Sequence, residues 1–289
     1  MVLENLSNPW KAEHRPSMLF LWGMLYAIIG GLVASALFPG KYASMVMVAL
    51  VSGVTIPLLY NTIRYEEQKD LEIPQEQQLL KEHGKAVMVF LMLFLGMTVG
   101  MTALYLAMPA EKTVNLFASQ IDTYKQINPA AQVSGNATQP GRFQRIFFNN
   151  LKVLFFCIIF SFLFGAGAIF VLTWNASVIA LAMGNVIRTN LSSLAADAGI
   201  VNVGAYLKVA VIDGFSRYFI HGVFEIASYV IAALAGGIIS VAIIKKHFTQ
   251  TEKAEHIILD VSDLLIASFV VLLLGAIIEV YVTPALFNL

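Results

Sequence analysis

Charged side chains are scarce in this sequence. Of its 289 residues, 12% are Asp, Glu, Lys or Arg, whereas soluble domains carry about 25%. Hydrophobic residues make up 58% of the chain. This composition excludes an ordinary soluble domain and predicts an integral membrane protein. Basic and acidic residues number 18 each, so no excess of charge favours nucleic acid as a partner.

Cysteine is almost absent as well, because Cys157 is the only one and lies inside an apolar run. An internal disulfide and a cysteine-based metal cluster are therefore excluded. The short patterns HExxH, GxSxG and the phosphate-binding P-loop are also missing, so no motif supports the hydrolases or NTPases that carry them. We accordingly predict a protein without enzymatic activity, with no catalytic residues, no metal and no cofactor.

Long hydrophobic runs dominate what is present. A helix of about 20 apolar residues spans the hydrocarbon core of a bilayer. The sequence predicts an all-α, polytopic membrane protein with about seven hydrophobic segments, at 17–38, 43–60, 86–108, 145–172, 176–187, 209–246 and 264–286. Residues 1–85 form a tail, a transmembrane hairpin and a charged loop, and residues 86–289 form a core with a long polar loop at 109–145.

The segment 176–187 is short, because about 12 residues reach only ~18 Å as a helix. It either crosses the membrane or re-enters on the same side. Re-entry would place Lys245 and Lys246 outside the cell, against the preference of basic residues for the cytoplasm. We therefore favour a crossing, with the N-terminus in the cytoplasm.

The most charged stretch is 61–85, between the second and third apolar runs. It is either a docking surface for a soluble partner or a solvated connecting loop that is partly helical. We favour the solvated connecting loop. The basic residues of this stretch indicate that it is cytoplasmic.

A polar stripe precedes the longest uncharged run. Asp213, Arg217, His221 and Glu225 follow one another at intervals of four, and each such step turns about 400° on an α-helix, so their side chains share one face. Glu225 lies about 30 Å along its helix from the basic end, and Glu279 lies about 24 Å along the antiparallel last helix. Helix geometry thus brings the two glutamates to the same depth.

With the entrances of the neighbouring segments added, the predicted polar cluster comprises Asn149, Asn150, Arg188, Asp213, Arg217, His221, Glu225 and Glu279. Ionisable groups in membrane spans are costly and usually face partners, cavities or ion paths. Three interpretations remain open: a structural polar network, a solute or proton path that uses His221 and Glu225, and a catalytic or metal site.

Small residues recur at helical spacing in several spans. The glycines that we expect to mediate helix packing are Gly96, Gly100, Gly165, Gly167, Gly236 and Gly237. Such positions let two membrane helices approach closely. They favour either packing within one chain or association with a second copy, of which a dimer is the form we expect.

Six motifs together carry a family resemblance: Asn149-Asn150, Gly165-Ala166-Gly167, Trp174-Asn175, Gly184, His221-Gly222-x-x-Glu225 and Gly236-Gly237. With them, residues 86–285 resemble the stage II sporulation protein M family of integral membrane proteins. Ile220 stands where that family often has proline, and the hairpin 17–60 is additional. Chains extended in this way are attributed to archaea.

The resemblance implies a non-enzymatic membrane scaffold or assembly factor, since a member of the family in spore-forming bacteria assembles with cell-wall-degrading enzymes. A channel or transporter with a polar pathway lined by His221 and Glu225 is the alternative, and an intramembrane hydrolase is the third. The expected partners are membrane lipids, a second copy of the chain and proteins that the sequence does not identify. The expected location is the cell membrane.

Overall fold

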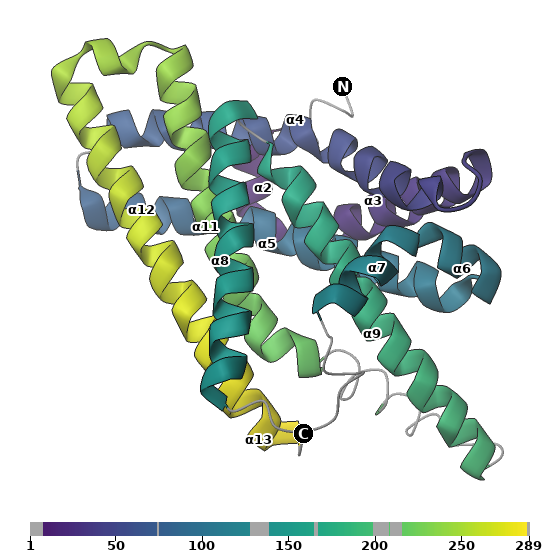
Figure 1. Ribbon diagram of the computed structural model, residues 1–289. Helices are drawn as coiled ribbons and strands as arrows, with labels where there is room; N and C mark the ends of the chain where they lie inside the picture. Colours follow the sequence, from purple (N-terminus) through teal and green to yellow (C-terminus); the bar gives the residue numbers. More distant parts are fainter. Residues whose placement is uncertain are drawn as a thin grey trace.

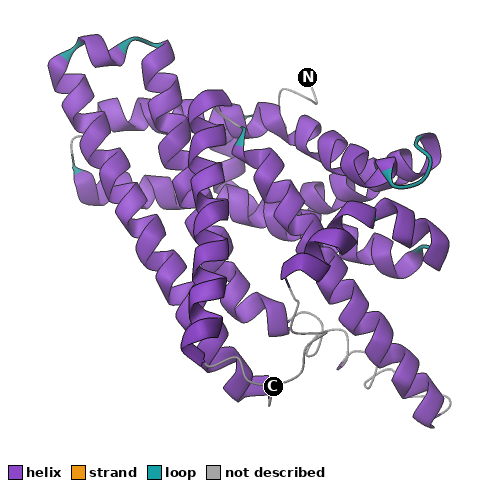
Figure 2. Cartoon of the chain, viewed as in Figure 1, coloured by secondary structure: helices purple, strands orange, loops and turns teal. Residues whose placement is uncertain are grey.

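The computed structural model describes residues 8–73, 75–127, 139–164, 167–198, 208 and 216–287. Every regular element within these ranges is helical, as Figures 1 and 2 show. Seven of the described helices are long and apolar enough to cross a membrane. The all-α, polytopic fold predicted from the sequence is confirmed.

The first part of the chain is a short helix, α2 (Pro9–His14), followed by the long helices α3 (Pro16–Leu37), α4 (Tyr42–Glu72) and α5 (Glu76–Ala107). At about 1.5 Å per residue, the 31 residues of α4 extend well beyond the ~30 Å of a hydrocarbon core. The C-terminal turns of α4 and the N-terminal turns of α5 therefore project past the apolar layer as helix.

These projecting turns correct one prediction. The stretch 61–85 was expected to be a solvated, partly helical loop. In the structure it is helical on both sides of a short connection near Ile73 and Gln75, and several of its charged side chains are buried. They are buried because they pair with one another and with other helices, as described below.

The polar connection predicted at 109–145 contains two short helices, α6 (Ala110–Leu116) and α7 (Ala118–Ile127). Side-chain hydrogen bonds fasten α7 to the longer helices. The Ser44 and Ser119 hydroxyls lie 2.7 Å apart, and the Gln120 amide donates to Ser177 at 3.1 Å. This part of the connection is therefore packed on the bundle.

The next two helices are α8 (Gln139–Phe164) and α9 (Ala168–Ala198). The sequence predicts the turn between them at Trp174 and Asn175, but in the structure α9 already begins at Ala168, earlier in the chain. The predicted end of a span at Leu172 and the predicted short segment 176–187 are wrong, because Leu172 and residues 176–187 all lie inside the 31-residue helix α9. The Asn175 amide donates to the Val171 carbonyl at 2.8 Å, and the Ser177 hydroxyl donates to the Trp174 carbonyl at 2.6 Å. These polar side chains bond to the helix backbone and so do not interrupt it.

The centre of the bundle is α11 (Arg217–Ile244). Within its most apolar window 78% of the residues are buried, against 22% for α8. The chain then turns through η3 (His247–Thr249) into α12 (Thr251–Ile277), the π-helical segment η4 (Ile278–Val282) and α13 (Thr283–Phe287). Figure 1 shows α8, α11 and α12 side by side, crossing the direction of α4 and α5.

Glycines allow the closest helix approaches. A Cβ on Gly96 would lie 2.0 Å from the Phe20 carbonyl oxygen of α3, and one on Gly100 would lie 2.6 Å from the Met24 carbonyl oxygen. On α11, Gly236 faces α8 at Ile158, and Gly237 faces Ile63 of α4. These four glycines are thus occupied by contacts within one chain. Gly167 lies just before α9, and Gly165 is outside the described residues.

Candidate functional site

The centre of the predicted polar cluster is a contact between three helices. The Asn150 amide of α8 donates to the Glu225 carboxyl group of α11 at 2.5 Å, and Glu225 interacts through hydrogen bonding and charge with Glu279 of η4. We call Glu225 and Glu279 the carboxyl pair. The pair lies where α12 changes to π-helical turns, a local geometry that is frequent at functional sites.

His221 lies one helical turn before Glu225 on α11. Its Nδ1 is 3.3 Å from the Thr283 hydroxyl, at the beginning of α13. Thr283 in turn follows Glu279 by one helical turn. The polar face of α11 therefore contacts the last part of the chain at two successive levels.

Arg188 is placed elsewhere. Its guanidinium group donates to the Tyr105 and Met108 carbonyl oxygens near the C-terminal end of α5 and stacks 4.6 Å from the Tyr105 ring centroid. A cation at this end satisfies carbonyl groups that have no partner within the helix and complements the helix dipole. The contacts described for Arg188 are thus with α5.

Three further residues belong to the predicted polar cluster. Asn149 is half-buried next to Asn150 on α8, and Arg217 is the first residue of α11. Asp213 lies outside the described residues. The structure therefore brings Asn150, Glu225 and Glu279 together, with His221 one turn away.

A second polar site is larger and was not expected as a site. Lys69 of α4 is buried, and its Nζ lies 2.7 Å from Glu66, 2.9 Å from Glu13 and 3.2 Å from Glu82. Glu13 comes from α2, so this lysine joins the N-terminal helix to α4 and α5. Burial, reinforced by the neighbouring Glu66, raises the pKa of Glu13 to about 7, while Lys69 acts in the opposite direction.

His83 of α5 continues this site. Its Nδ1 is 2.8 Å from Glu66, and its Nε2 is 3.2 Å from Asp70 and 3.0 Å from Asp260 of α12. Both His83 and Asp70 are buried. We call this set the ion-pair network: Glu13, Glu66, Lys69, Asp70, Glu82, His83 and Asp260.

A further group of charges lies beside the network. Glu67 of α4 is fully buried, with Lys245 at 2.5 Å and His247 at 2.7 Å. Lys245 and His247 both come from the turn between α11 and α12. Contacts between charged side chains therefore join three segments that the sequence predicts on one side of the membrane. They are the N-terminal tail, the stretch 61–85 and the region after Lys245.

The sequence contained a weak signal for this site. Glu66 and Asp70 are four residues apart, and Glu66 and Lys69 are three apart, so they share one helix face. That spacing is equally typical of a solvated helix, and only the packing of α2, α5 and α12 against this face distinguishes the two cases.

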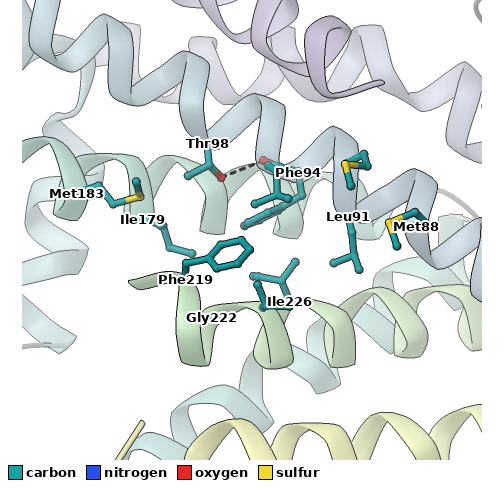
Figure 3. Close-up of a pocket in the computed structure, with 12 residues that line it drawn as sticks. Met88, Leu91, Phe94, Thr98, Ile179, Met183, Phe219, Gly222 and Ile226 are labelled. Atoms are coloured by element: carbon teal, nitrogen blue, oxygen red, sulfur yellow. Dashed lines mark hydrogen bonds between the residues drawn. The ribbon is translucent and has the colours of Figure 1, made fainter. Parts of the chain in front are cut away.

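A pocket of about 240 Å³ lies between α5, α9 and α11. Figure 3 shows its lining side chains, among them Phe94, Ile179, Phe219 and Ile226, which are apolar. The only polar contact drawn there is the Thr98 hydroxyl, which donates to the Phe94 carbonyl at 2.9 Å within α5. Neither His221 nor the carboxyl pair lines this pocket.

The comparisons with known proteins agree with the resemblance seen in the sequence. The family model described as stage II sporulation protein M matches residues 86–284. The chain belongs to this family of membrane proteins, and the predicted extent of the resemblance is confirmed. The comparisons with curated proteins and with solved structures returned no match.

Proposed function

We propose that this protein is a non-enzymatic membrane scaffold or assembly factor, which organises partner proteins or the bilayer. The observation that supports it is the way in which polar groups of the interior bond to one another across helices. Asn150 bonds to Glu225, and His221 lies against Thr283, while the pocket beside α11 is apolar. Buried polar groups that are satisfied in this way hold a bundle together.

The surface offers apolar faces for the proposed partners. The α8 helix is little covered by the rest of the chain and exposes Phe155, Phe156 and Leu163. Lipid, a second copy of the chain or another membrane protein would complement this face. Because Gly96 and Gly100 are occupied by α3, we propose α8 as the face for the dimer.

A photoreactive amino acid at Phe155 or Phe156 would test this proposal in native membranes. Discrete crosslinks to a second copy or to a defined protein are the expected result. The control position is Leu154, one residue away and buried, where we expect crosslinks only within the chain. Labelling of lipid alone at both Phe155 and Phe156 would contradict the scaffold.

The carboxyl pair supports the alternative, a channel or transporter. Ionisable groups within membrane helices often mark proton or ion paths, and Glu225 and Glu279 face each other there. In sealed proteoliposomes with a pH-sensitive dye, a transporter would carry a flux that Glu225→Gln abolishes without loss of the folded protein. The scaffold predicts no flux above that of empty liposomes.

We further propose that the ion-pair network faces the cytoplasm of the cell membrane. With Cys157 replaced by Ser, single cysteines can be placed at two exposed positions, Tyr42 and Lys85. Tyr42 is the first residue of α4, whereas Lys85 follows His83 of α5, which contacts Glu66 and Asp70 near the other end of α4. An impermeant thiol reagent applied to intact cells should label the cysteine at position 42 and spare the one at position 85. The reverse pattern would invert the orientation.

A further inference from the structure

The ion-pair network contains three side chains whose donor atoms converge on one point. The Asp70 and Asp260 carboxyl oxygens and a ring nitrogen of His83 all lie within 4.8 Å of one another. They come from α4, α12 and α5, so the point lies where three helices meet. Carboxylate oxygen and imidazole nitrogen are ligands that Zn²⁺, Mn²⁺ and Fe²⁺ accept.

The spacing of these atoms suits a bound ion. Two ligands about 2.0–2.1 Å from a tetrahedral metal lie about 3.3 Å apart. The Nε2 atom of His83 is 3.2 Å from Asp70 Oδ1 and 3.0 Å from Asp260 Oδ2. A small inward movement of the two carboxyl groups would bring all three ligands to bonding distance of one ion.

The Asp70 carboxyl group supports a bound cation independently of the ligand spacing. Its side chain is 1% exposed, and neither of its oxygens accepts a hydrogen bond from the described residues. The single N–H that Nε2 of His83 could carry is directed to Asp260 at 3.0 Å, so it does not also serve Asp70. A buried carboxylate without a donor is costly, and a cation between Asp70 and His83 would satisfy it.

Glu66 completes the arrangement. It lies 2.8 Å from Nδ1 of His83 and would accept the Nδ1 proton, so that Nε2 could bind a metal ion that displaces the proton directed to Asp260. A carboxylate behind a ligating histidine is the usual means by which proteins orient this ligand and increase its basicity. The network also has five carboxyl groups, those of Glu13, Glu66, Asp70, Glu82 and Asp260, against Lys69 and His83, so acidic side chains outnumber basic ones.

We propose that Asp70, His83 and Asp260 bind one divalent transition-metal ion, with Zn²⁺ as the first candidate and Mn²⁺ as the second, and with water at the remaining positions. The ion would have a structural role. Asp70 and His83 precede the family region 86–284, whereas Asp260 lies within it. The metal would therefore fasten the additional N-terminal hairpin to the family core.

The test uses the full chain in mild detergent after removal of the affinity tag. The protein is dialysed against Zn²⁺ or Mn²⁺ and then against metal-free buffer, and the metal per chain is measured by mass spectrometry. We expect about one ion per chain in the wild type, and at least about a tenfold loss of affinity in Asp70→Asn and Asp260→Asn. Glu67→Gln is the matched control, since it alters a buried acid of the same helix that is paired with Lys245, and it should retain the ion.

Should the aspartate variants fail to fold, the wild type still decides the matter. A chelator should lower its melting temperature, Zn²⁺ should restore it, and X-ray absorption should show only nitrogen and oxygen ligands. A folded wild type that retains no ion and does not respond to the chelator would overturn the proposal. So would Asp70→Asn protein that binds as much metal as the control.

Discussion

The ion-pair network is largely buried and the carboxyl pair is half-buried, and the two sites differ in composition. In the network, carboxyl groups surround Lys69 and His83, whereas the carboxyl pair has two acids and the neutral amide of Asn150. The network lies on the ends of α4 and α5 that project past the apolar layer. Burying a charge there costs less free energy than burying it within the hydrocarbon layer, because water is nearby. The carboxyl pair lies on the apolar helices themselves. The difference is that the acids of the network are paired with Lys69 and His83 at the helix ends, whereas the contacts described for the carboxyl pair include no cation.

The two sites also connect different parts of the chain. The carboxyl pair joins α8, α11 and η4, all within the family region. The network joins α2, α4 and the start of α5 to α12, so it attaches the N-terminal extension to that region. Variants that affect one attachment and not the other would therefore sharpen the comparison.

The largest effect is expected from Lys69→Met. This change removes the cation of the buried Glu13 carboxyl group and leaves Glu66 with His83 alone of its two described partners. The loss of one partner of a buried ion pair costs about 3–5 kcal/mol. Thermal unfolding in detergent would measure the loss. Lys85→Met is the control, because Lys85 is 44% exposed and pairs with Glu82 alone, so the change should cost no more than about 1 kcal/mol. Equal losses in the two variants would show that the network is solvated.

Next in size is Gly96→Ala, which tests the packing of the extension. The added methyl group would meet the Phe20 carbonyl oxygen of α3, and overpacking of this kind typically costs about 1–3 kcal/mol. Gly53→Ala on α4 is its matched control, since nothing lies within 4 Å of a Cβ there, and alanine favours a helix by up to about 1 kcal/mol. We expect opposite shifts in melting temperature, and a neutral Gly96→Ala would mean that α3 is not held against α5.

Glu225→Ala probes the carboxyl pair. It leaves the buried Asn150 amide without its acceptor, at a cost of about 1–3 kcal/mol. Glu225→Gln keeps an acceptor oxygen and removes one of two facing acids, so it should unfold close to the wild-type temperature. If the glutamine variant is as unstable as the alanine variant, the charge of Glu225 itself stabilises the bundle, and the contrast with the network disappears.

The smallest effect concerns pH. The pKa of Glu13 is raised to about 7 in the folded protein from an ordinary value of 4.5, so the folded state binds a proton more tightly than the unfolded state does. The contribution of Glu13 to stability is therefore fully present below about pH 4.5 and is lost as the pH rises through about 7. The shift alone corresponds to about 2 kcal/mol between pH 5.5 and 8. Allowing for screening by solvent reduces this to about 1 kcal/mol, so we expect the melting temperature to fall by roughly 2–4 °C. Glu13→Gln should remove this part of the pH dependence, and an unchanged profile would place the proton on another group.

The sequence predicted the helical bundle well because each span is a local property of composition and length. Its errors were also local. Trp174 and Asn175 resembled a turn, but their polar neighbours bond to the helix backbone and α9 continues through them. Counting residues along the two helices predicted that Glu225 and Glu279 lie at a similar depth, while Arg188 was assigned to the cluster although its described contacts are with α5.

By itself, then, the sequence determined the class of protein, the number of spans and the family, and it predicted that Glu225 and Glu279 lie at a similar depth. These follow from apolar run length and helical periodicity, which act along the chain. Only the tertiary structure decided that Glu66, Lys69, Asp70 and His83 are buried. Burial of a charged helix face depends on which other helices cover it, and here α2 and α12 supply Glu13 and Asp260 from positions far away in the sequence.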